Sequence, residues 1–201
     1  MLKSRRLIFI IASGLLTLIF SCAPTPVVIQ KPPHLPSRHV INKVPQIHQG
    51  KNECGPTSLA MVLNYYGIKE KKDELKDDLK WNLEKGIPYQ NMLQFPFKKF
   101  GLKIALVKRG SIEKLMEYIA QDQPVIVRQW LNYEDKAEGG MTHLRVAMGY
   151  DHEKEMIYMR DPAIKSKGFS NLNYKEFLDL WDISNHSNPS KNLMLIIIPE
   201  E

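Results

Sequence analysis

Six prolines fall between residues 23 and 45 of this chain, and this cluster limits the possible fold more than any other feature. Proline has a fixed φ and no backbone donor, so such a density prevents both a helix and a central strand. We therefore expect an extended tether over residues 23–43. The folded part is then one domain over residues 44–201, long enough to bury a sizeable core without disulfides.

The composition narrows the class of protein further. The chain has 28 Lys+Arg against 22 Asp+Glu, 43% apolar residues and two cysteines, which excludes a disordered chain and a disulfide-stapled miniprotein. If residues 1–21 are removed, Lys3, Arg5 and Arg6 go with them and the surplus of positive charge becomes small. A nucleic-acid partner is therefore not expected, because such proteins carry a clustered basic face.

The N-terminal segment has the order of a secretory signal peptide. Three basic residues lie in residues 1–6, and residues 7–20 are mostly apolar but fewer than the roughly 20 that a bilayer-spanning helix needs. The run Ile19-Phe20-Ser21-Cys22 resembles a bacterial lipobox, which implies that residues 1–22 are a lipoprotein signal ending in a lipidated Cys22. Its acyl chains would anchor the protein stably. The alternative is an uncleaved anchor helix with an incidental thiol; both place the domain outside the cytoplasm, in the envelope of a bacterium.

Hydrophobic periodicity predicts helices in the front half of the domain and strands later. In the second helix Leu75, Leu79 and Leu83 recur every four residues, which indicates that it covers the core, and Pro96 should break or kink the third. The fold class expected is α+β, with a helical N-terminal half packed on an antiparallel sheet. The predicted helices span residues 56–66, 70–83, 88–100, 111–121 and 173–181, and the predicted strands 102–108, 124–127, 142–151, 155–162 and 193–199.

Cys54 is the candidate nucleophile. It stands in the run Asn52-Glu53-Cys54-Gly55-Pro56, at the first turn of the first helix, and it has no cysteine partner once Cys22 is lipidated. Unpaired N–H groups and the helix dipole at such a place can lower a thiol pKa from ~8.5 toward ~3.5–7.5. The alternative is that Cys54 has no catalytic role and packs as a small buried apolar residue, as free cysteines commonly do.

Of six histidines, only His143 stands where a strand begins, directly after Gly139-Gly140, which is a place for a side chain that faces a cleft. A histidine there could pair with the thiolate and protonate a leaving amine. A hydrogen-bonded structural histidine is the alternative. The others are expected in the tether, in the loop before Cys54, or in polar turns: His34, His39, His48, His152 and His186.

Asp161 ends the following strand, so a hairpin would return it beside His143, where its carboxylate could orient the imidazole. Found together and in this order, Cys54, His143 and Asp161 indicate a catalytic triad much more specifically than any one of them does alone. The oxyanion of a peptide-cleaving enzyme also needs donors, and the Cys54 N–H together with the side-chain amide of Gln49 or Gln46 could serve. Solvated loop glutamines are the alternative.

Three stretches together resemble papain-like cysteine peptidases of the bacteriocin-processing type: residues 49–67 around Cys54, 143–151 around His143, and 160–162 around Asp161. The resemblance spans about residues 44–198. In that family, the peptidase domain of certain export ATPases cuts leader peptides after a double glycine. The resemblance implies a papain-like fold with Cys54 as nucleophile, His143 as general base and acid, Asp161 as its orienter and Gln49 as oxyanion donor.

The chain departs from the transporter-fused form of that family. It has no phosphate-binding glycine-rich loop, so neither ATP nor another cofactor is expected. The first hypothesis is a membrane-anchored cysteine endopeptidase acting on a peptide or protein substrate. A peptide acyltransferase or transpeptidase would use the same thiol chemistry. A non-catalytic peptide-binding module is the third possibility. A zinc site through Cys54 and His143 is disfavoured, because four suitably spaced ligands are missing.

Overall fold

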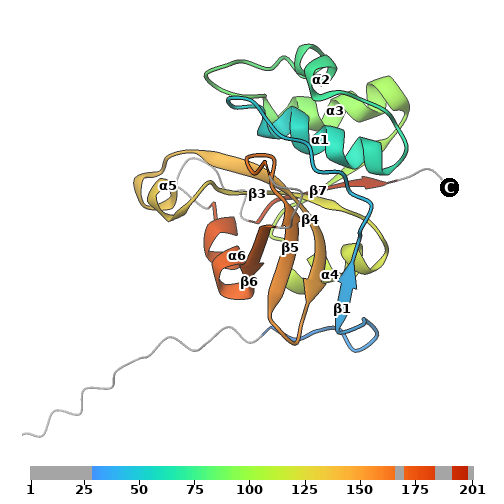
Figure 1. Ribbon diagram of the computed structural model, residues 1–201, viewed down its shortest axis with the longest axis vertical. Coiled ribbons are helices and arrows are strands. Elements are labelled where there is room, and N and C mark those ends of the chain that lie inside the picture. The colour runs from blue at the N-terminus through green and yellow to red at the C-terminus, as the bar shows by residue number, and fades with distance from the viewer. Residues whose placement is uncertain (1–28, 166–169, 184–191, 199–201) are drawn as a thin grey trace, which may run out of the picture.

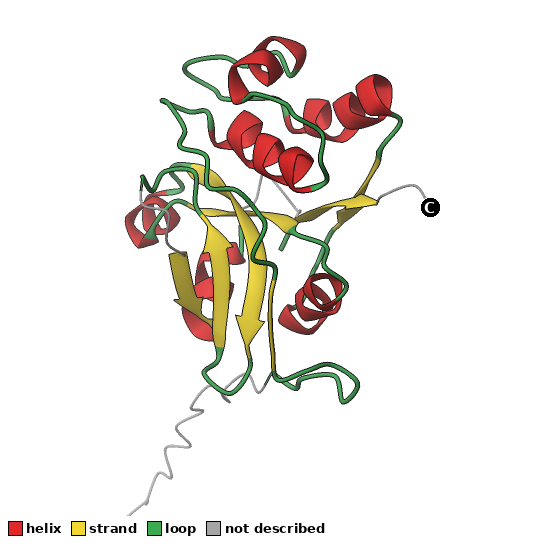
Figure 2. Cartoon of the chain, turned by 45° about the vertical axis from the view of Figure 1, so that its right-hand side comes forward, coloured by secondary structure: helices red, strands yellow, loops and turns green. Residues whose placement is uncertain are grey.

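The computed structural model describes residues 29–165, 170–183 and 192–198. Helices and an antiparallel sheet make up these residues, as expected (Figures 1 and 2). The helices are α1 (Cys54–Tyr65), α2 (Lys72–Asp78), α3 (Tyr89–Phe100), α4 (Ile112–Ala120), α5 (Tyr133–Glu138) and α6 (Tyr174–Trp181). The strands are β1 (Arg38–Val40), β2 (Lys103–Val107), β3 (Val125–Trp130), β4 (Thr142–Asp151), β5 (Met156–Arg160), β6 (Ser170–Asn173) and β7 (Met194–Ile198).

The sheet runs in the order β2-β7-β3-β4-β5-β6, with β1 paired to β4 and every pairing antiparallel. The front helices α1, α2 and α3 gather at one end of the molecule, above the sheet, while α4 and α6 lie against its lower part (Figures 1 and 2). This is the predicted arrangement of a helical N-terminal half packed on an antiparallel sheet. The site described below lies where α1 meets β4.

Helix α1 is the centre of the front half. Its residues from Gly55 to Leu63 are all buried, so the helix is covered on every side. Pro56 occupies its first turn, where the missing N–H costs nothing, and Gly67 just beyond its end adopts φ +85, a conformation open to glycine. The Ser58 hydroxyl donates to the carbonyl of Leu144 at 3.1 Å, which ties the helix to β4.

Two helices differ from their predictions. Helix α2 ends at Asp78 rather than continuing to residue 83, because Lys80 takes φ 54 and the chain then turns back through an Asn82–Gly86 bridge. Leu75 and Leu79 are buried as predicted, but Leu83 is 51% exposed. Of the break or kink expected at Pro96, the break is wrong, because α3 continues across Pro96 to Phe100.

The tether prediction is wrong for its last part. Residues 38–40 form β1, which pairs with the end of β4 from Arg38↔Asp151 to Val40↔Gly149. Ile41 and Val44 are buried in the core. Because residues 37–44 contain no proline, this stretch can pair as an added strand although the segment as a whole is proline-rich. The folded domain therefore begins before residue 44, and residues 23–28 lie outside the described part of the chain.

Two short elements were not predicted, α5 and β6. Helix α5 is exposed and has no buried residue, so it leaves no hydrophobic period in the sequence. The β4–β5 hairpin is confirmed, with a bulge between Ala147 and Gly149. No helix within the described ranges has both the length and the apolar character to cross a membrane.

Candidate active site

Cys54 is the first residue of α1, and its half-buried thiol meets the imidazole of His143 within hydrogen-bonding reach. The backbone N–H groups of Leu144 and Gly55 also donate to the sulfur. Burial by itself would raise the pKa of this thiol, but the contact with His143 and the two N–H donors outweigh it, and the pKa lies below its ordinary value. The thiolate is therefore favoured.

His143, the second residue of β4, is 3% exposed. Its Nε2 lies 2.7 Å from Oδ1 of Asp161, so the other ring nitrogen is left for the sulfur. Burial would lower the pKa of the imidazole, yet the bonds to Asp161 and Cys54 raise it above its usual value. A depressed thiol pKa beside a raised imidazole pKa is the signature of a thiolate–imidazolium pair.

Asp161 follows β5, and the antiparallel pairing of β4 with β5 returns it to His143 as predicted. The carboxylate is 6% exposed and also accepts from the N–H of Ala163 at 2.8 Å. Burial alone would raise its pKa; His143 and Arg145 outweigh that effect and hold it well below the ordinary range. Asp161 is thus an anion under the conditions in which the imidazole is charged.

Arg145 is a site residue that the sequence interpretation missed. Its Nε donates to Oδ2 of Asp161 at 2.8 Å, and the rest of the guanidinium donates to Gln129 Oε1, Trp130 O and Leu131 O. A signal existed in the sequence, because residues two apart on a strand share one face, and Arg145 stands two after His143. The guanidinium fixes the second carboxylate oxygen while the histidine takes the first.

The two glutamines have different surroundings. Gln46 donates through Nε2 to the carbonyls of Asp161 at 2.7 Å and Ile164 at 3.0 Å, so its amide supports the loop after the aspartate. Gln49 is half-buried and tied to the same loop by its backbone N–H, which donates to Pro162 O at 2.9 Å. Of the pair left open by the sequence, Gln46 is the one that commits its side-chain N–H groups to that loop, whereas Gln49 Oε1 is buried without a hydrogen-bond partner among the described residues.

A second buried ionic group lies immediately before the thiol. The Glu53 carboxylate accepts from Lys76 Nζ at 2.9 Å, from Lys72 Nζ, and from the Gly50 N–H at 2.8 Å. These donors outweigh the effect of burial and lower the pKa of Glu53 to about 2. The sequence interpretation assigned α2, which carries both lysines, only the role of covering the core.

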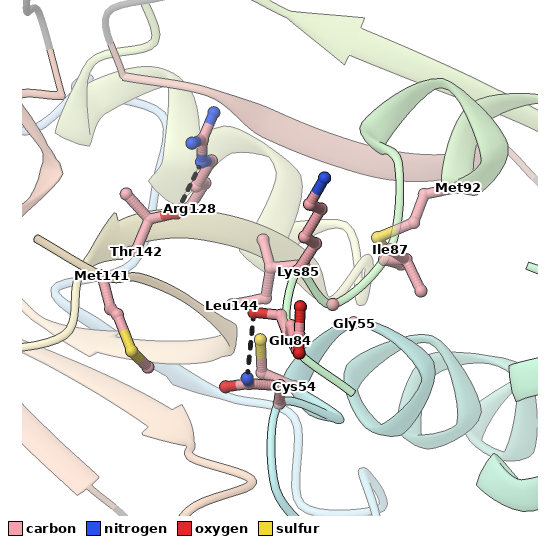
Figure 3. A pocket seen from close by; sticks show the side chains of 12 residues that line it. Cys54, Gly55, Glu84, Lys85, Ile87, Met92, Arg128, Met141, Thr142 and Leu144 are labelled. Atoms are coloured by element: carbon pink, nitrogen blue, oxygen red, sulfur yellow. Dashed lines mark hydrogen bonds between the residues drawn. The ribbon is translucent and has the colours of Figure 1, made fainter. Parts of the chain in front are cut away.

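A pocket of about 420 Å³ opens beside the sulfur (Figure 3). Its lining joins α1, the segment after α2, α3, β3 and the start of β4, and the Cys54 side chain points into it. The lining contains both apolar side chains and charged or polar ones. The lining residues are Asn52, Cys54, Gly55, Glu84, Lys85, Gly86, Ile87, Met92, Arg128, Met141, Thr142 and Leu144.

The other predicted residues lie away from this centre. His39 pairs with Asp122 at 2.8 Å, and the ring of His48 contacts Pro162 O at 3.1 Å. Cys22 and His186 fall outside the described residues. Within the described ranges, no cluster of three or more His, Cys, Asp or Glu side chains could hold a metal ion.

Comparison with known proteins gives a family and a fold. A family model described as Peptidase_C39 like family matches residues 41–188. No curated protein matches the chain.

Solved structures with the same fold include three peptidases. A C39-like peptidase from Bacillus anthracis is 20% identical with a TM-score of 0.63, over 82% of this chain and 99% of that one. A double glycine motif protease from an AMS/PCAT transporter, solved with its leader peptide, is 24% identical with a TM-score of 0.56, over 79% and 94%. The peptidase domain of Streptococcus ComA, an ABC transporter of a quorum-sensing pathway, is 20% identical with a TM-score of 0.57, over 78% and 99%.

Proposed function

This chain belongs to the C39-like peptidase family, and on that premise we propose that it is a lipid-anchored cysteine endopeptidase of the bacterial cell envelope. Cys54 is the nucleophile, His143 the general base and acid, Asp161 the residue that orients the imidazole, and Gln49 a donor to the oxyanion. The observation that carries this proposal is the buried His143, whose imidazole contacts both the Cys54 thiol and, through Nε2, the Asp161 carboxylate.

The chemistry follows from the protonation states. The Cys54 thiolate attacks the carbonyl carbon of the scissile peptide bond, and the imidazolium of His143 then protonates the leaving amine as the C–N bond breaks. The result is a thioester on the sulfur and a released amine. Neutral His143 next removes a proton from water, whose oxygen attacks the thioester, and the carboxylic acid and the thiolate are released. Through both steps the Asp161 carboxylate accepts a hydrogen bond from the Nε2–H of His143, which keeps the other ring nitrogen toward the sulfur.

Each attack on the carbonyl carbon forms a tetrahedral intermediate, whose negatively charged oxygen needs hydrogen-bond donors. The Cys54 N–H at the start of α1 is one, and the Gln49 side chain is the other. The hydrogen bond from the Gln49 N–H to Pro162 O supports this assignment, since it joins the loop before the nucleophile to the loop after Asp161.

The envelope location rests on the N-terminal segment. Its basic start, its apolar run and the lipobox ending at Cys22 favour a diacylated or triacylated anchor rather than a spanning helix. A peptide substrate is supported by the neighbour that was solved with its leader peptide.

The test uses the full-length protein in detergent micelles. Mass spectrometry of the peptides that contain Cys22 and Cys54 follows the alkylation of each cysteine separately. We expect iodoacetamide to alkylate Cys54 faster than it alkylates glutathione at pH 6, because the thiol pKa is lowered. Wild-type protein should cleave peptides whose two ends are both blocked, which only an endopeptidase can do. Cys54→Ala should abolish that cleavage.

Two results would contradict the proposal. One is cleavage that persists in Cys54→Ala, and the other is a library of blocked peptides that wild-type protein leaves intact. Products that carry an added amine in place of water would instead assign acyl transfer to the same thiol.

A further inference from the structure

Glu53 occupies a position where a carboxylate should disfavour the thiolate form of the nucleophile. It directly precedes Cys54, and a negative charge near a thiol raises the thiol pKa. The side chain is only 8% exposed, so solvent screens its charge weakly. Nevertheless the thiol pKa lies below its ordinary value, and the surroundings of Glu53 explain how the two are compatible.

Two lysines of α2 neutralise this carboxylate. Lys76 Nζ lies 2.9 Å from Oε1, and Lys72 Nζ binds Oε2, so each carboxylate oxygen has its own cation. Both lysine side chains are 22% exposed. Asp73 also contacts both lysines, but at 66% exposure its charge is largely screened by solvent.

The lysines are held in place by the helix that carries them. Leu75 on α2 and Leu79 directly after it are fully buried, which docks this short helix against the front half of the domain. Trp81, just after α2, donates its indole N–H to the carbonyl of Asn52 at 2.8 Å. The segment that follows α1 in the sequence therefore binds the loop that precedes α1 at two places, Glu53 through the lysines of α2 and Asn52 through Trp81.

The same carboxylate also shapes the loop before the nucleophile. The Gly50 N–H donates to Glu53 Oε2 at 2.8 Å, which closes the turn between Gln49 and Cys54. A Cβ on residue 50 would lie 2.8 Å from that oxygen, so an added methyl group would displace the carboxylate from its present position. Movement of Glu53 would therefore shift both proposed oxyanion donors, the Cys54 N–H and Gln49.

We propose that Glu53 is a positioning residue for the Cys54 nucleophile: clamped by Lys72, Lys76 and the Gly50 N–H, it fixes the loop before α1 while its charge is cancelled. This rests on the proposed peptidase function. Helix α2 thereby supports the reaction as well as the core.

Other charged groups also face the thiol. His143 touches it from β4 and is itself held by Asp161 and Arg145. Across the pocket stand Glu84 and Lys85 from the segment after α2, and Arg128 from β3. All of these stay unchanged in the variants below, so differences between variants report on the Glu53 cluster.

The experiment compares three variants and a control, each as full-length protein in micelles. Lys76→Met removes one cation, Glu53→Gln removes the anion but keeps its shape, and Gly50→Ala keeps every charge but displaces the carboxylate. The control is Lys114→Met, which removes a cation of an exposed ion pair with Glu117 on α4. For each protein, the pH dependence of Cys54 alkylation gives the apparent thiol pKa, and blocked-peptide cleavage gives kcat and KM.

We expect loss of a lysine and loss of the carboxylate to shift the apparent pKa of the Cys54 thiol in opposite directions. Lys76→Met should raise the apparent thiol pKa by roughly 0.3 to 1 unit, because it leaves the buried anion less compensated, and Glu53→Gln should lower it. Gly50→Ala should change the thiol pKa least, yet reduce kcat by about 10-fold with KM within about twofold, because displaced donors affect the transition state. The control should match wild type in both measurements.

Three results would overturn the proposal. They are thiol pKa values that match wild type in both charge variants, pKa values that move in the same direction in both, and an unchanged kcat in Gly50→Ala. Any of these would make the cluster a structural ion group only. Failure of the peptidase function is distinguishable, because wild-type protein would then show no turnover while the alkylation shifts could still be measured.

Discussion

Asp161 is the residue on which the charge balance of the site depends. It accepts from His143, from Arg145 and from the Ala163 N–H, so its carboxylate is fully bonded within the protein. A buried carboxylate of this kind remains ionised and keeps the neighbouring imidazole protonated. The consequence appears in the pH dependence of the reaction.

We expect a bell-shaped profile of kcat/KM against pH. Activity should rise as pH increases through the lowered pKa of Cys54, which forms the thiolate, and fall as pH passes the raised pKa of His143, which removes the acid for the leaving amine. The alkaline limb should therefore lie above 6.5, the ordinary value for histidine.

Asp161→Asn tests the origin of that limb. Loss of the negative charge should move the alkaline limb to lower pH and reduce kcat by about 10²- to 10⁴-fold. An Asp161→Asn profile with its limbs unmoved would show that the carboxylate does not set the imidazole pKa. Because Arg145 would then be buried without its anion, a thermal melt must accompany the kinetics.

Glu53 gives a prediction for stability. Its pKa of about 2 in the folded protein is below its ordinary 4.5, so its contribution is fully present above about 4.5 and is lost as pH falls toward 2. Denaturant unfolding at pH 5 and at pH 3 should therefore show a smaller loss of stability in Glu53→Gln than in wild type. An equal loss in both proteins would mean that Glu53 is not specifically stabilised as an anion.

Residue types and their order predicted part of this centre. Cys54, His143 and Asp161 could be found because each stands at the end of a recognisable helix or strand, and the structure brings all three together. Glu53 could not be assigned a role, since its partners lie on α2, a helix whose position only the tertiary structure fixes. The role of the Gln49 side chain as a donor to the oxyanion stays a prediction.

Among the elements, α1 and the segment after α2 together form the wall of the pocket. Gly55 is packed against Ile87: a Cβ on residue 55 would lie 2.3 Å from Ile87 Cδ1 and 2.7 Å from its Cγ1. Both residues line the pocket beside Cys54 (Figure 3). The contact of these two residues therefore fixes part of the pocket lining next to Cys54.

This contact predicts a rescue. Gly55→Ala should lower kcat/KM by about 10-fold or more, because Ile87 must move and the pocket wall with it. Combining it with Ile87→Ala should restore much of the loss, since the second change makes room for the added methyl group. Steady-state kinetics on one blocked peptide checks this, and strictly additive losses in the double variant would contradict it.

Elements with a hydrophobic period were predictable, and those defined by tertiary contacts were not. Helices α1, α4 and α6 and the β4–β5 hairpin follow their patterns. The end of α2 was missed because a left-handed residue, Lys80, stops it despite the continuing leucine spacing. Strand β1 was missed because its pairing partner lies more than a hundred residues away in the sequence.

Across the described molecule, strand β1 and the candidate active site lie at opposite ends of β4. His143 is the second residue of β4, whereas β1 pairs with the end of β4 at Asp151, about 26 Å away for eight residues at ~3.3 Å each. The approach to β1 is fastened there too, because Tyr150 Oη donates to Pro36 O and the His152 N–H donates to Ser37 O. The described chain therefore reaches β4 at the end remote from Cys54 and His143.

We expect the anchor to leave catalysis on soluble peptides unchanged. Protein lacking residues 1–22 and full-length protein in micelles should have kcat/KM values within about twofold, while only the full-length form partitions with lipid vesicles. A large gain in activity on truncation would place the N-terminal segment in or near the cleft, against this arrangement.

In the proposed mechanism, His143 holds Cys54 as a thiolate. The direct test of this claim is a pH titration of the ultraviolet thiolate absorbance in full-length protein that carries Cys22→Ser, with and without His143→Ala. We predict a thiol pKa below the ordinary range when His143 is present and a return to at least the ordinary range when it is absent. Identical titrations for the two proteins would contradict the account.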